Sequence, residues 1–137
     1  MGTRDALITT TRVTLALVFV AAAAAKLFLG EDSHSHSGSG FEELLRSDWL
    51  RHCVSVVELS TACLLVSRSW RVGLDLSVLL AIGFLAVLLG LLLLDVPVSS
   101  CGCIGSIPID LTTHALLAFG IGGAALLAGL IARTPSP

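Results

Sequence analysis

Residues 72–94 read VGLDLSVLLAIGFLAVLLGLLLL, and this stretch decides the fold class. Its one charged residue is Asp75. Because a helix crosses the hydrocarbon core of a bilayer with ~20 apolar residues, residues 72–94 predict a transmembrane helix. The whole chain agrees, since 55% of its 137 residues are hydrophobic, 13% are charged and the mean hydropathy is +0.94. This composition is too apolar for a water-soluble domain of this size.

Three further apolar segments flank this stretch, at residues 13–29, 50–66 and 113–132. The second is the shortest, and it reaches membrane length only if residues 49–51 form an interfacial first turn. The polar connection that follows it is too brief to do more than turn the chain between two antiparallel helices. The sequence therefore predicts one all-α domain over residues 1–137, a bundle of four transmembrane helices embedded in a lipid bilayer.

The first segment has a second interpretation. Two arginines, an apolar run and the alanines of residues 21–25 resemble a secretory signal with a small-residue cleavage site. We favour an uncleaved helix because the apolar run resumes after Lys26 with Leu27, Phe28 and Leu29.

The arginines predict the orientation of the bundle. With four spans both termini share a side, and Lys and Arg in short loops are retained in the cytoplasm. Five arginines fall on the side of the termini: Arg4, Arg12, Arg68, Arg71 and Arg133. We therefore expect a multi-pass protein of the plasma or inner membrane with cytoplasmic termini and exterior loops at residues 30–50 and 96–111. The net charge of −2 and the lack of a basic patch argue against a nucleic-acid partner.

The cysteines carry the chemistry that we predict. Cys101, Gly102 and Cys103 lie in the second expected exterior loop, on the side where disulfides persist. A disulfide across one residue is strained, and Gly102 can adopt the backbone angles that it needs. Strained, exposed disulfides are oxidising and labile, so they tend to be catalytic or regulatory. Cys53, expected at the same membrane depth, is a candidate third thiol, whereas Cys63 lies deeper and is interpreted as a small packing residue.

Two other uses of these cysteines stay open. A structural disulfide, with or without Cys53, would only brace the loop. A zinc site would take Cys53, Cys101, Cys103 and His114, but a one-residue spacer is tighter than zinc ligands usually have, so we expect no metal. His52 and His114, each near a helix end, could instead act as a local base for a thiol.

Intramembrane charge is the second clue. Lys26 and Glu58 both lie inside expected spans, where a charge costs ~2.5 to 3.5 kcal/mol, so the two are predicted to pair across their helices. The structural interpretation is an ion pair that fixes helix register. The functional one is a polar patch beneath the cysteine loop that relays protons or binds a quinone-like headgroup. A quinone is the one cofactor considered, because the sequence has no cofactor-binding fingerprint.

The order of these features resembles the MauE branch of the DoxX-like membrane proteins. The similar parts are Ala-Ala-Lys-Leu at residues 24–27, Glu58 followed by small residues, and Cys-Gly-Cys-Ile-Gly at residues 101–105. Ile104 stands where that family usually has Phe. The resemblance implies a four-helix protein that matures a disulfide-rich periplasmic protein, the small subunit of methylamine dehydrogenase, alongside a thioredoxin-like partner. By this resemblance, Cys101 and Cys103 are the functional site. Lys26 and Glu58 also match the family, but the resemblance assigns them no role.

The resulting hypothesis is a membrane thiol-disulfide oxidoreductase or disulfide-relay protein. Cys101 and Cys103 would exchange electrons with an exterior thioredoxin-fold protein, and Gly102, His114, Lys26 and Glu58 would support them. One alternative is a non-enzymatic scaffold or maturation factor whose disulfide is structural. Another is a small transporter subunit with Lys26 and Glu58 lining a pathway between helices.

Overall fold

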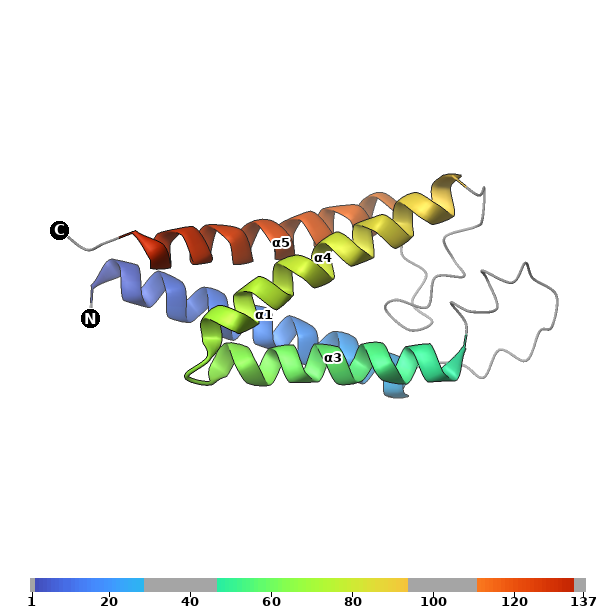
Figure 1. Ribbon diagram of the computed structural model, residues 1–137, viewed down its shortest axis with the longest axis horizontal. Coiled ribbons are helices and arrows are strands. Elements are labelled where there is room, and N and C mark those ends of the chain that lie inside the picture. The colour runs from blue at the N-terminus through green and yellow to red at the C-terminus, as the bar shows by residue number, and fades with distance from the viewer. Residues whose placement is uncertain (1, 29–46, 94–110, 135–137) are drawn as a thin grey trace.

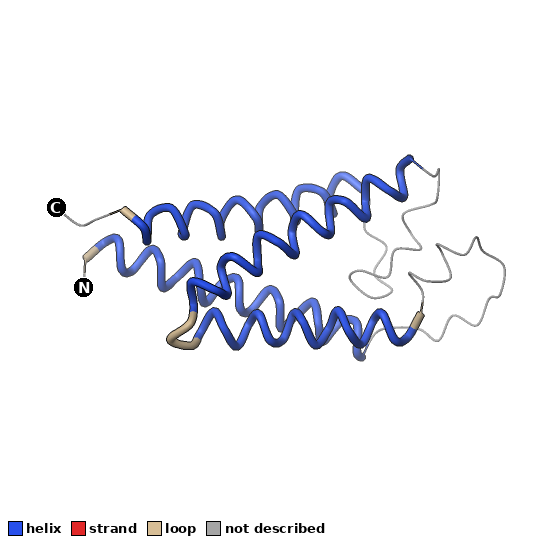
Figure 2. Tube along the Cα trace, viewed as in Figure 1, coloured by secondary structure: helices blue, strands red, loops and turns tan. Residues whose placement is uncertain are grey.

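The structure, a computed structural model, describes residues 2–28, 47–93 and 111–134, and its regular elements there are all helices. Figure 1 and Figure 2 show how the helices are arranged. All four helices are long and apolar enough to cross a membrane, which confirms the predicted fold class. They are α1 (Thr3–Phe28), α3 (Asp48–Val66), α4 (Trp70–Leu93) and α5 (Leu111–Arg133).

The helices form two antiparallel pairs that pack together. α1 runs along α3 and α4 along α5, while α1 also contacts α5 and α3 contacts α4 (Figure 1). Both chain termini and the turn between α3 and α4 lie at one end of the bundle, called here the terminal end. α1 and α4 end, and α3 and α5 begin, at the opposite end, called here the loop end. The position of a residue along the bundle is therefore described by its nearness to the terminal end or to the loop end.

α1 begins at Thr3, well before the apolar segment that starts at residue 13. The extra turns carry Arg4, whose guanidinium donates to the backbone carbonyl oxygens of Ile131 and Thr134 at the end of α5. The last carbonyls of a helix have no partner within the helix and need donors from outside it. The first turns of α1 are thus stabilised by the hydrogen bonds of Arg4 to the end of α5. A hydropathy profile cannot predict such bonds.

Arg12 caps the end of α3 in the same way. Its Nε donates to the Leu65 carbonyl at 2.8 Å, and a terminal nitrogen donates to the Ser67 carbonyl at 3.1 Å. The guanidinium also lies over the Trp70 ring, 5.0 Å from its centroid. Arg12 therefore ties α1 to the place where α3 turns into α4.

A glycine lets that turn close tightly. A Cβ on Gly73 would lie 2.8 Å from the backbone nitrogen of Leu65, so the backbones of α4 and α3 are in direct contact there. α4 starts at Trp70 rather than at residue 72, which leaves only residues 67–69 for the turn. This confirms that the connection does no more than reverse the chain.

Toward the terminal end the interior is mostly apolar, and the buried hydroxyls of Thr61 and Ser77 donate to carbonyls of their own helices. Its core cluster consists mostly of alanine and leucine: Leu15, Ala16, Phe19, Ala62, Leu65, Leu74, Ala125 and Ala128. Small side chains permit the close helix contacts that stabilise bundles in lipid. The polar interior described next lies on the same inward faces, nearer the loop end.

Candidate functional site

The centre of the candidate site is an ion pair between α1 and α3. Lys26 Nζ donates to Glu58 Oε1 at 2.6 Å. Both residues are buried, with 4% of Lys26 and 9% of Glu58 exposed. The predicted pairing of these two residues is therefore confirmed. A lone charge in hydrocarbon is costly, so each residue offsets the burial of the other.

The pair has hydrogen-bonding capacity that protein atoms do not use. Among the described residues, the second carboxylate oxygen, Glu58 Oε2, is buried and has no hydrogen-bond partner. An ammonium carries three N–H donors. Within the described part of the chain, Lys26 Nζ donates one hydrogen bond, to Glu58 Oε1. One acceptor and further donors thus meet at a buried point between two helices.

Further polar side chains are buried near the loop end. Ser55 on α3 is only 1% exposed, and its hydroxyl donates to the Arg51 carbonyl at 2.9 Å. The Nε of Arg51 is a second buried atom without a partner among the described residues. Arg51 also forms a surface ion pair with Asp48 at 2.7 Å. The inward face of α3 is therefore polar from its first turns to Glu58.

Ser55 and Arg51 are not predicted from the sequence as parts of this site. The signal that could have found them is helical spacing, because residues 51, 55 and 58 lie four and three positions apart and share one helix face. The presence of a buried carboxylate at Glu58 identifies that face as the inward one.

His114 is also buried, in the first turn of α5. It lies on the inward face of α5 with Ala118 and Ala125, and its ring is stacked with that of Phe84, with centroids 6.1 Å apart. His114 is thus inside the bundle, in the half nearer the loop end. Its role as a base for a thiol stays a prediction.

The predicted thiols are divided between described and undescribed parts of the chain. Cys53 lies in the second turn of α3, close to the loop end, and is a half-buried free thiol. Cys101, Gly102 and Cys103 lie outside the described residues. The described part of the chain contains no group of three or more His, Cys, Asp or Glu residues placed to hold a metal ion.

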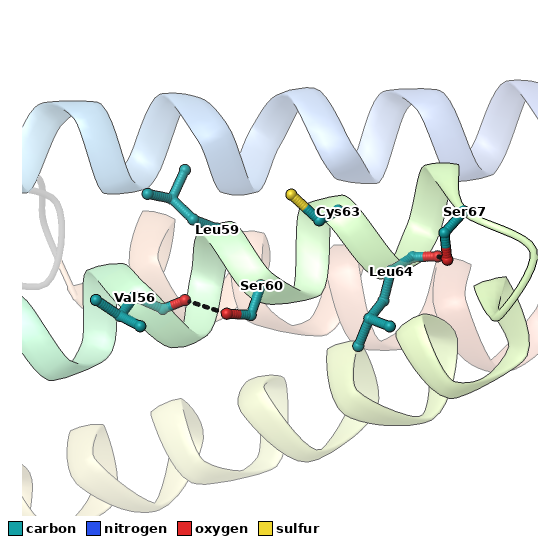
Figure 3. A pocket seen from close by; sticks show the side chains of 6 residues that line it. All are labelled: Val56, Leu59, Ser60, Cys63, Leu64 and Ser67. Carbon is teal, nitrogen blue, oxygen red and sulfur yellow. Dashed lines mark hydrogen bonds between the residues drawn. The ribbon is translucent and has the colours of Figure 1, made fainter.

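The interpretation of Cys63 as a packing residue is wrong, because its side chain is exposed on the outer surface of α3. The neighbouring position, Ala62, belongs to the inward face, and successive helical residues point about 100° apart. Cys63 lines a shallow open groove along this outer surface (Figure 3). The groove is lined by residues of α3 and by the serine that follows it: Val56, Leu59, Ser60, Cys63, Leu64 and Ser67.

Together, four membrane-length helices and a buried ion pair between two of them define a multi-pass α-helical membrane protein with a polar interior at one end. A family model described as methylamine utilisation protein MauE matches residues 4–133. The chain therefore belongs to the MauE family, which confirms that part of the resemblance seen in the sequence. No curated protein and no solved structure matches the chain.

Proposed function

We propose that this MauE-family protein is a thiol-disulfide relay of the membrane, with Cys101 and Cys103 as its reactive pair and Cys53 as a third thiol. A thiolate of a thioredoxin-fold partner attacks the Cys101–Cys103 disulfide, forms a mixed disulfide and releases one thiolate of the pair. The partner's second thiolate then attacks the mixed disulfide. The partner leaves oxidised, and the relay cysteines have taken up two electrons.

One observation carries this proposal: Cys53 lies at the loop end, where the two helices that flank Cys101 and Cys103 in the sequence end and begin. Cys53 lies in the second turn of α3, which begins there. Cys101 and Cys103 belong to the segment that leaves α4 and enters α5, and both of these helix ends lie at the loop end (Figure 1). The remaining cysteine, Cys63, faces outward further along α3.

The charge distribution supports an exterior loop end. Arg4 and Arg12 cap helices at the terminal end, and Arg71 and Arg133 lie at the same end. Positive residues next to membrane spans favour the cytoplasmic side. A cytoplasmic terminal end leaves the loop end in the compartment where disulfides form, and where an exported protein would be matured. The family model that matches the chain is described as methylamine utilisation protein MauE, so we propose that the exported protein serves methylamine utilisation.

The test is the redox state of each cysteine in isolated membranes, read by differential alkylation and mass mapping across defined thiol-disulfide potentials. We expect a bond that includes Cys101 or Cys103 and that opens reversibly at potentials typical of periplasmic oxidoreductases. Cys101→Ser should abolish exchange with a thioredoxin-fold protein while the bundle stays folded. Cys63→Ser is the matched control and should leave exchange unchanged.

Two results would contradict the relay. A disulfide that resists reduction until the bundle unfolds would support the scaffold with a structural disulfide. Loss of exchange in Cys101→Ser only together with loss of folding would support it as well.

A further inference from the structure

We propose that water enters the bundle from the loop end along the inward face of α3 and reaches the Lys26–Glu58 pair, which thereby exchanges protons with the aqueous phase on that side alone. The proposal is independent of the cysteine chemistry. It depends on two buried atoms whose hydrogen-bonding needs no described protein group meets, Arg51 Nε and Glu58 Oε2.

These two atoms lie at the ends of one continuous polar line. Arg51, Ser55 and Glu58 share a face of α3, and Lys26 joins them from α1. Arg51 Nε is a donor at the outer end. The Ser55 hydroxyl gives its proton to the Arg51 carbonyl, so its oxygen remains able to accept. Glu58 Oε2 accepts at the inner end, and donors and acceptors thus follow one another at the spacing of helical turns.

Water is the molecule that meets these needs. In a bilayer no solvent reaches an unpaired buried group from the lipid side, and an unpaired charged atom in a low dielectric is strongly unfavourable. Buried waters in proteins typically bind two to four polar groups that would otherwise be unsatisfied. A water at Oε2 can donate to that oxygen and accept from Lys26 Nζ or from a further water nearer Ser55.

The line of unsatisfied polar atoms ends at Glu58. The next buried residues of α3 are Thr61, Ala62 and Leu65. The Thr61 hydroxyl donates to the Val57 carbonyl of its own helix at 2.8 Å, and Ala62 and Leu65 belong to the apolar core cluster. Leu65 is fully buried, and Leu15 and Phe19 of α1 lie in the same cluster. Apolar interiors of this kind stay dry. Access to the pair is therefore one-sided, open toward the loop end and closed toward the terminal end.

The chain offers a clean probe, because Lys26 is its only lysine. Protein labelled with ¹⁵N at the lysine Nζ gives one ammonium signal in lipid bilayers. The rate at which magnetisation passes from water protons to that signal, in water-edited solid-state NMR, reports whether water contacts Lys26. We expect rapid transfer in the native chain, against slow transfer to the backbone amide of Leu65 as a dry reference.

Two variants identify the route. Ser55→Val puts methyl groups on the polar line and should slow transfer to Lys26 severalfold. Ser60→Val, on the exposed outer face of α3, should leave the rate unchanged. Transfer to Lys26 as slow as transfer to the Leu65 amide in the native chain would overturn the proposal, whether or not the variants fold. An equal effect of both variants would overturn the route along Ser55.

Discussion

Replacing Lys26 with Met should destabilise the bundle by about 3 kcal/mol. The change keeps an unbranched side chain of similar length and leaves Glu58 buried without its partner. Breaking a buried ion pair by removing one partner costs about 3 to 5 kcal/mol. Water at Glu58 Oε2 partly solvates the remaining carboxylate, so we expect the lower end of that range. Because about 1.4 kcal/mol is a factor of ten, the unfolding equilibrium should shift on the order of a hundredfold.

The double variant Lys26→Met with Glu58→Gln should recover most of this loss, since it leaves no unpaired buried charge. The free energy that couples the two positions should therefore be about 2 kcal/mol or more. Asp75→Asn is the control because it breaks the pair between Arg133 and Asp75. Those side chains lie 3.2 Å apart but are 67% and 64% exposed. An exposed pair contributes about 0 to 1 kcal/mol, so this variant should stay close to the native stability.

The assay is reversible unfolding in mixed lipid and detergent micelles titrated with dodecyl sulfate, followed by tryptophan fluorescence. Trp70 packs against the core cluster and reports on the folded bundle. A cost below about 1 kcal/mol for Lys26→Met would refute the reasoning, because it is the cost expected of a solvent-exposed pair. A double variant no more stable than Lys26→Met alone would refute the explanation that the unpaired carboxylate of Glu58 causes the loss.

Three further predictions concern the terminal end. Gly73→Ala places a Cβ against the backbone of α3 and should cost about 1 to 3 kcal/mol, whereas Gly83→Ala, with open space around it, should be neutral or stabilising by up to about 1 kcal/mol. Arg12→Met removes two charged hydrogen bonds and should lower the free energy of unfolding by about 2 kcal/mol or more. Arg68→Met is the control and should leave the stability almost unchanged. The same micelle titration measures all four variants. A reporter enzyme active only in the cytoplasm should be active when fused after Thr134, and its silence there would reverse the proposed orientation.

The elements that the sequence predicts are those governed by the bilayer. Only helices satisfy their backbone groups within a single span, so four apolar runs predict four helices. The Lys26–Glu58 contact is predictable for the same reason, since a charge inside a span needs a partner. The start of α1 is not predictable from hydropathy, because Arg4 and Arg12 extend that helix by capping α5 and α3.

Hydropathy also cannot predict which side of α3 faces inward. Lipid is as apolar as a protein core, so a small residue such as Cys63 carries no signal for either side. Only buried polar residues reveal the inward face, and on α3 these are Ser55, Glu58 and Thr61. The buried carboxylate of Glu58 is the feature that defines the inward face of α3, and this face includes Ser55 and leaves Cys63 outside.

The polarity of the interior bears on which function this bundle can perform. A pathway for a solute across the bilayer needs polar or hydrated surface along its whole length, because each unpaired polar group in hydrocarbon is costly. In the described part of the chain, Glu58 is followed on the inward face of α3 by Thr61, whose hydroxyl is bonded within its own helix, and then by Ala62 and Leu65 of the apolar cluster. The buried charges can therefore communicate with one side only. This asymmetry favours chemistry at the loop end, where Cys53 lies, over a transporter subunit that uses Lys26 and Glu58 to line a continuous route.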